Sequence, residues 1–173
     1  MTSTPWIEND RLFFDEAKGG QRWQEYVARF LGRCGLDATS APLMLRKDID
    51  DAWKFRDTHD IWCEGLPIEV KSRKVRFTTP DDFPYPTIFV DTVKKWEGRE
   101  WKPFAYICIS TMTGRMICLP GYQSDGWNQE RRRDATRDYD DWFYSAPREQ
   151  WRPIERLVTA IAKYKTRTVP PSA

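Results

Sequence analysis

The sequence contains few of the residues that build zinc sites. Histidine occurs once, at His59, and the four cysteines show no Cys-x-x-Cys spacing. Since structural zinc sites need four such ligands at short spacings, the sequence argues against one. Cys34, Cys108 and Cys118 lie within apolar runs, which favours buried, reduced thiols over disulfides.

Long apolar segments are absent as well. The N-terminus, MTSTPWIENDR, has no basic start followed by an apolar stretch of the kind that directs secretion. No apolar run approaches the roughly 18 residues that a membrane-spanning helix needs. We therefore expect a soluble, intracellular (cytoplasmic) protein with no membrane partner.

Neither sign of charge dominates. The 28 basic and 26 acidic residues leave a net charge of +2, so a basic surface for nucleic acid would have to be local. Hydrophobic and aromatic residues, at 40% and 14% of 173 residues, suffice for one core without disulfide or metal staples. We predict a single domain over 1–165 and a flexible tail over 166–173.

Periodicity indicates both helices and strands. Apolar residues recur at helical spacing from Gln21 to Cys34, and Gly35 ends that helix. The stretch 38–58 gives no clear assignment. The other predicted elements are strands at 60–63 and 66–71 joined by a tight turn, an irregular segment at 78–86, a strand at 87–90, a helix at 91–100, a hairpin of 104–110 with 115–119, and a final helix from about Pro153. This order predicts an α/β fold with a mixed β-sheet flanked by helices.

Two carboxylates and a lysine converge on the first predicted hairpin. Glu69 and Lys71 lie two residues apart in a strand and so share one face, while Ile68 and Val70 point to the opposite, apolar face. Asp60 opens the preceding strand, and the turn folds it back toward Glu69. An ordinary surface hairpin with a cross-strand ion pair is the competing interpretation.

This group of side chains suits a divalent cation. Mg²⁺ prefers hard oxygen ligands, usually one or two carboxylates together with waters and phosphate oxygens. Such a metal lowers the pKa of bound water and neutralises charge that develops on a phosphate. Lys71 would then stabilise that charge or hold the attacking water.

The pattern of Asp60 followed by Glu69-Val70-Lys71 on the adjoining strand resembles the motif of the PD-(D/E)xK nuclease superfamily, which includes type II restriction enzymes and archaeal Holliday junction resolvases. The resemblance covers roughly 20–109, and position 59 is His59 where the family usually has proline. It implies a restriction endonuclease-like fold and hydrolysis of DNA by a metal-activated water, with Mg²⁺ or, as a substitute, Mn²⁺. It also implies Asp60, Glu69 and the main-chain carbonyl of Val70 as metal ligands, with Lys71 acting on the water or phosphate.

The first helix adds a second point of resemblance. Archaeal resolvases carry Gly-x-x-x-Glu near the start of this helix and a glycine eleven residues after the acid. Here Gly20 and Gly35 frame the same spacing, and the matching residue is Gln24. Gln24 borders the apolar stripe of the helix, whereas Glu25 points nearly opposite to it. We therefore expect Gln24 beside the metal site, with Glu25 as the alternative because it is the better ligand chemically.

Basic and aromatic residues downstream suggest contacts with DNA. Arg73 should follow Lys71 on the active face, and phosphate contacts are reasonable roles for Arg73, Lys74 and Arg76. Phe83 and Tyr85 in the proline-rich loop would stack on bases. The arginines Arg131, Arg132 and Arg133 would form a second phosphate contact, but they alternate with nearby aspartates, and a solvated surface of ion pairs explains them at least as well.

Several assignments stay open at this point. Asp57 is a weaker alternative to Asp60. His59 is either a general base or, with more weight, a loop side chain. Asp91 is either a further ligand or, with more weight, the N-cap of the following helix.

We expect a Mg²⁺-dependent deoxyribonuclease. The alternative is a catalytically weak or inactive protein of the same fold that binds nucleic acid or acts as an adaptor, which the glutamine at position 24 favours. An inhibitor of a host protein is a further option on which the sequence carries no signal. Endonuclease, exonuclease and junction-resolving activities are not separable from the sequence, and the oligomeric state is open, with a homodimer among the options.

Overall fold

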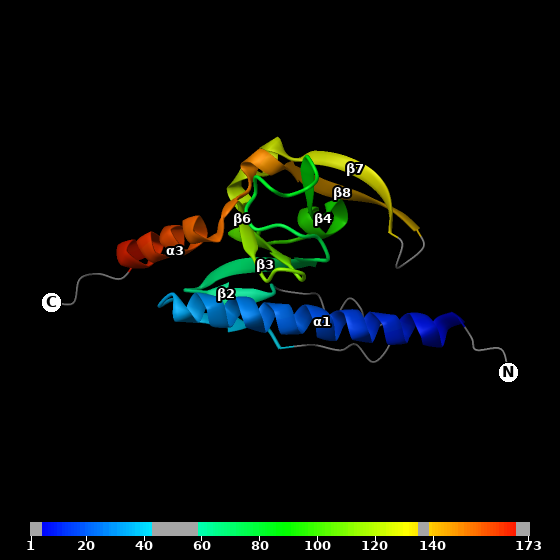
Figure 1. The fold of residues 1–173 in the computed structure, drawn as a ribbon, viewed down its shortest axis with the longest axis horizontal. Helices are drawn as coiled ribbons and strands as arrows, with labels where there is room; N and C mark the ends of the chain where they lie inside the picture. The colour runs from blue at the N-terminus through cyan, green and yellow to red at the C-terminus, as the bar shows by residue number, and fades with distance from the viewer. Residues whose placement is uncertain (1–4, 43–58, 135–138, 169–173) are drawn as a thin grey trace.

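The computed structural model describes residues 5–42, 59–134 and 139–168 and has a mixed α/β architecture (Figure 1). A six-stranded sheet has the strand order β1-β2-β3-β5-β6-β9, and a three-stranded sheet has the order β4-β8-β7. The strands are β1 (Ala38–Ser40), β2 (Ile61–Cys63), β3 (Leu66–Arg73), β4 (Thr87–Thr92), β5 (Ala105–Ser110), β6 (Met116–Pro120), β7 (Asn128–Asp134), β8 (Tyr139–Pro147) and β9 (Arg152–Pro153). The helices are α1 (Pro5–Arg33), α2 (Val93–Glu97) and α3 (Ile154–Thr168), with 3₁₀ turns η2 (Gly121–Gly126) and η3 (Arg148–Gln150).

The larger sheet is covered on both faces. It is mixed, because β3 and β5 run parallel while their other partners are antiparallel. All six residues of β5 are buried, as expected for a strand with packing on both sides. Helices α1 and α3 cover one face, with α1 along the lower edge of Figure 1. The second sheet and α2 cover the other face, so the predicted flanking by helices holds for one face.

The predicted hairpin that carries the motif is confirmed. Strands β2 and β3 pair antiparallel, and Glu64 and Gly65 in the turn have φ of 49° and 77°. Positive φ at both central positions is the geometry of a type I′ turn, which matches the twist of the strands. Ile61, the first residue of β2, pairs with Ile68. From Glu69 onward, β3 therefore has no strand partner on this edge among the described residues.

Helix α1 is longer than the periodicity predicts, since it begins at Pro5. Its end agrees, because Gly35 follows it with a φ of 82°. The prediction that Cys34 is buried is wrong: this thiol is exposed just beyond the helix, while Cys108 and Cys118 are buried as expected.

The C-terminal helix is confirmed, with Ile154, Leu157 and Ile161 buried against the larger sheet. It continues to Thr168, beyond the boundary predicted at 165. None of the described helices combines the length and the apolar character needed to cross a membrane.

The middle of the chain departs most from expectation. The helix predicted over 91–100 is limited to Val93–Glu97, and its N-cap is Thr92, whose Oγ1 accepts a hydrogen bond from Lys95 N at 3.1 Å. The hairpin of β7 and β8 was not predicted. It pairs with β4 and builds a second sheet, which packs aromatic residues over the larger one.

Candidate active site

The candidate site lies just before the start of β2, where one edge of β3 is left without a strand partner among the described residues. Asp60 fills this position with its carboxylate. Its Oδ2 accepts a hydrogen bond from Val70 N at 2.7 Å, and its Oδ1 accepts one from Gln24 Nε2 at 2.9 Å. The N–H and C=O of one strand residue point to the same edge, so the carbonyl of Val70 also faces this edge. Helix α1 and strand β3 thus meet at Asp60.

Glu69 is fully buried and surrounded by positively charged groups. Its Oε1 lies 2.8 Å from Arg99 Nη1 and 3.6 Å from His59 Nδ1. Its Oε2 lies 3.6 Å from both Lys71 Nζ and Lys95 Nζ. Although these distances are those of ion pairs, neither oxygen has a hydrogen-bond partner of good geometry among the described residues. These cations compensate the buried charge of Glu69 mainly through ionic contacts.

The two carboxylates titrate in opposite directions. Burial and the nearby charge of Glu69 raise the pKa of Asp60 to about 6. Burial also opposes ionisation of Glu69, but His59, Lys71, Lys95 and Arg99 outweigh it and hold the pKa of Glu69 well below its usual range. Glu69 is consequently ionised at neutral pH, and Asp60 feels a repulsion that an added cation would relieve.

Asp91 is not the N-cap of α2, the role favoured for it, and its carboxylate lies beside Lys71. It is the penultimate residue of β4 and is buried, and Thr92 takes the N-cap position. Its Oδ1 lies 3.5 Å from Lys71 Nζ, and its Oδ2 accepts a hydrogen bond from Tyr106 OH at 3.1 Å. Lys71 is thereby held between Glu69 and Asp91, which fixes its ammonium group beside the carboxylate pair.

The residues present fit a magnesium ion bound by two carboxylates. Asp60 and Glu69 interact electrostatically, the Val70 carbonyl faces the same edge, and the buried Glu69 oxygens have ion-pair partners but none of good hydrogen-bond geometry among the described residues. Within 5–42, 59–134 and 139–168 there is no group of three or more His, Cys, Asp or Glu side chains that would hold a metal. Mg²⁺ needs fewer, because waters and substrate phosphates complete its shell. Asp57, the weaker alternative to Asp60, lies outside the described residues.

Two residues outside the motif, Gln24 and His59, lie against its carboxylates. Gln24 reaches Asp60, whereas Glu25 is exposed and its Oε1 lies 3.4 Å from Gln21 Nε2. His59 lies in a loop, outside the helices and strands, as predicted. It is buried against Trp62, with ring centroids 5.3 Å apart, and faces Glu69.

The proposed DNA contacts separate into two groups. Arg73 follows Lys71 along the strand face and lies 5.8 Å from the centroid of the Phe89 ring, and Lys74 and Arg76 are exposed just beyond β3. The arginines of β7 are partly committed elsewhere: Arg131 pairs with an aspartate of β8 at 3.1 Å, and Arg132 with Glu130 at 2.6 Å. Arg133 is exposed on the same strand. These pairs match the solvated-surface interpretation of that run.

The loop over 78–86 is irregular, as predicted. Stacking of Phe83 on a base is wrong, because this ring is buried and packs 5.2 Å from the centroid of Phe77. Tyr85 is exposed and remains available for such a contact.

Sequence reasoning missed Lys95 and Arg99. Both lie on or just after α2 and reach Glu69 across the space between the two sheets. Neither belongs to a spaced motif, so only the packing of α2 against the larger sheet reveals them.

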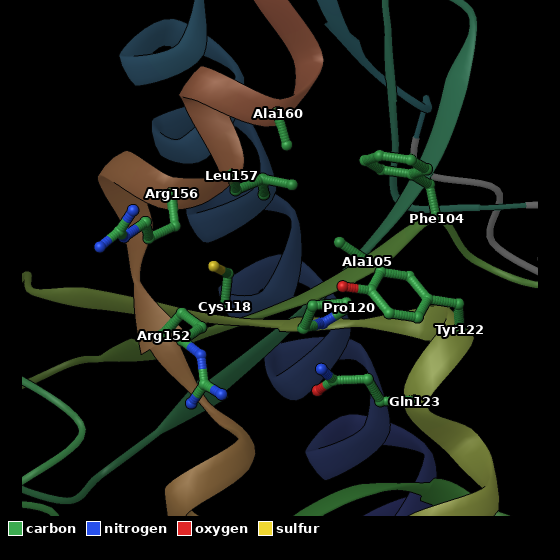
Figure 2. Close-up of a pocket in the computed structure, with 10 residues that line it drawn as sticks. All are labelled: Phe104, Ala105, Cys118, Pro120, Tyr122, Gln123, Arg152, Arg156, Leu157 and Ala160. Carbon is green, nitrogen blue, oxygen red and sulfur yellow. The ribbon is translucent and has the colours of Figure 1, made fainter. Parts of the chain in front are cut away.

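A cavity of about 330 Å³ lies elsewhere, between β6, α3 and η2 (Figure 2). The rings of Phe104 and Tyr122 line one side of it, and the side chains of Arg152 and Arg156 the other. None of the candidate site residues lines this cavity, so it does not bear on the chemistry at Glu69.

No protein-family model matches this chain, and comparisons with curated proteins and with solved structures gave no match.

Proposed function

We propose that the protein is a metal-dependent deoxyribonuclease of the PD-(D/E)xK type with a restriction endonuclease-like fold. The observation that carries the proposal is the convergence of Asp60, Glu69 and Lys71 at the unpaired edge of β3. Lys71 Nζ lies 3.6 Å from Glu69 Oε2, and Asp60 bonds to the main-chain N–H between them in sequence. A surface ion pair would not require a fully buried carboxylate at its centre.

Each residue has a definable task in this mechanism. Asp60, Glu69 and the carbonyl of Val70 would hold Mg²⁺, or Mn²⁺ in its place. The bound ion supplies a water of lowered pKa and neutralises charge on the phosphate. Lys71, held by Asp91, donates hydrogen bonds to the attacking water or to the phosphate oxygens as charge develops on them. Gln24 keeps the carboxylate of Asp60 oriented toward the site.

A second candidate function has its own support. The alternative is a binding or adaptor protein that keeps the scaffold with little or no catalysis. It is favoured because both carboxylates already have internal partners: Gln24 donates to Asp60, and Arg99 lies 2.8 Å from Glu69. Lys71 counts against it, since binding alone needs no ammonium group fixed between two carboxylates.

Cleavage assays separate the two candidates. The purified protein is incubated with linear duplex, circular, single-stranded and branched DNA in Mg²⁺, Mn²⁺ or EDTA, beside Lys71→Ala. We expect cleavage of at least one substrate with a metal, none in EDTA, and loss of activity in Lys71→Ala while its circular dichroism is unchanged. Equal inertness of both folded proteins on every substrate would favour the binding function.

A further inference from the structure

Helix α2 presents two adjacent lysines to different surroundings. Two contacts fix the orientation of α2 about its axis. Thr92 caps its N-terminus, and the buried ring of Trp96 packs against Trp127, with ring centroids 4.8 Å apart. With the helix held in this way, Lys95 points to the site, where its Nζ lies 3.6 Å from Glu69 Oε2. Lys94, one position earlier on the same helix, is exposed.

The cations around Glu69 differ in their access to solvent. The side chains of Arg99 and His59 are 7% and 5% exposed and lie against Oε1. Those of Lys71 and Lys95 are 21% and 31% exposed and lie against Oε2. The arginine and histidine thus form a dry side of the site, and the two lysines form a side that solvent, and hence a substrate, can reach.

We propose that Lys95 is a second catalytic lysine, which together with Lys71 binds the oxygens of the phosphate that is cleaved. Two ammonium groups that share one carboxylate oxygen lie close enough for a single phosphate group to contact both. A phosphodiester offers two non-bridging oxygens, one for each lysine, and gains the most from them when negative charge builds up on those oxygens. This inference rests on the proposed nuclease function and adds to it a residue outside the motif.

The charge balance of the site supports this role. Asp60, Glu69 and Asp91 are three acids, and Lys71, Lys95 and Arg99 are three cations within the same cluster. Arg99 and Lys71 each contact both Glu69 and Asp91, so these two buried acids already share two cations. The cluster would become more positive when a divalent ion binds, and the exposed lysine pair is where an anionic phosphate would offset that charge.

The test compares Lys95→Ala with Lys94→Ala, an alanine substitution one position earlier on the same helix. Single-turnover cleavage with Mg²⁺ is measured at saturating protein, and DNA binding is measured in EDTA over a range of salt concentrations. We expect Lys95→Ala to cleave roughly 10²-fold more slowly. The slope of log binding constant against log salt should fall by about 0.9, the loss of one phosphate contact to duplex DNA. Lys94→Ala should match the wild type, and Lys95→Arg should retain most of the activity.

Two outcomes overturn the role assigned to Lys95, and a third overturns the nuclease function on which it rests. If Lys95→Ala behaves like Lys94→Ala, Lys95 does not contact the substrate. If its cleavage falls but its salt slope is unchanged and its urea midpoint drops, Lys95 only stabilises Glu69. If the wild type itself cleaves no DNA, the proposed function fails, and the salt slopes still decide whether Lys95 contacts phosphate.

Discussion

Replacing Arg99 with methionine should destabilise the protein far more than loss of an ordinary ion pair. Arg99 is the closest cation to Glu69, at 2.8 Å, and both side chains are buried. Methionine keeps much of the apolar stem but removes the charge. Glu69 would then be a fully buried carboxylate that has lost its nearest partner.

The expected loss follows from the burial of this pair. Removing one partner of a buried ion pair costs about 3–5 kcal/mol, because the remaining charge is left without compensation. Lys71 and Lys95 stay within 3.6 Å of Glu69, which places the expected loss at the lower end of that range. With a urea dependence of about 2 kcal/mol per molar, a loss of about 3 kcal/mol lowers the unfolding midpoint by roughly 1.5 M.

Urea unfolding followed by Trp fluorescence and circular dichroism checks this value. The matched control is Arg131→Met, which removes the same charge from a pair with Asp140 whose side chains are 64% and 46% exposed. That exposed pair should contribute at most about 1 kcal/mol. A double substitution of Arg99→Met with Glu69→Gln should be more stable than Arg99→Met alone, because the uncompensated charge is gone.

Magnesium provides a second test of the same variant. A cation bound at Glu69 would replace the charge of Arg99, so Mg²⁺ at about 100 times its dissociation constant should restore roughly 2.7 kcal/mol. If Arg99→Met unfolds at the same urea concentration as Arg131→Met, Arg99 does not compensate the buried charge of Glu69, and the expected loss of stability is refuted.

Three further predictions concern Asp82, two glycines and Gln24. Hydrogen bonds from two threonines lower the pKa of Asp82 from 3.8 to about 2. The ionised carboxylate therefore stabilises the folded protein above pH 3.8, and this stabilisation is lost as the pH falls toward 2. The difference in urea unfolding midpoint between the wild type and Asp82→Ala should shrink over that pH range. Gly121→Ala should unfold at a clearly lower temperature than the wild type, because the added Cβ would meet a main-chain carbonyl. Gly32→Ala lies in open space on a helix and should gain about 0.5–1 kcal/mol of folding stability. Equal melting temperatures of the two variants would contradict this. Gln24→Glu should lower the melting temperature in EDTA, because its carboxylate would face Asp60, and should increase the stabilisation by Mg²⁺; an unchanged response to Mg²⁺ would separate Gln24 from the metal site.

The sequence predicts the hairpin of the motif because its signals are local. Alternation along β3 and the Glu64-Gly65 turn determine which side chains share a face, and they do so without help from distant residues. The same local logic identified Gln24 over Glu25, since the apolar stripe of α1 sets which side of the helix meets the sheet.

The remaining parts of the site depend on contacts between distant segments. Lys95 and Arg99 reach Glu69 only because the second sheet carries α2 over the larger one. That sheet was missed because every residue of β7 is polar and β8 exposes Trp142, so neither strand shows the alternation expected of a half-buried strand. Asp91 was misjudged for a related reason: its neighbour Thr92 is an equally good cap, and only tertiary packing decides between them.

Metal-initiated DNA cleavage tests the central claim most directly. A labelled DNA substrate is pre-bound to the protein in EDTA, excess Mg²⁺ is added, and product is followed in the wild type and in Glu69→Gln. We expect wild-type cleavage to begin only when Mg²⁺ is added and Glu69→Gln, still folded and still bound to DNA, to yield no product. Cleavage by Glu69→Gln at the wild-type rate, or wild-type cleavage that continues in EDTA, would contradict it.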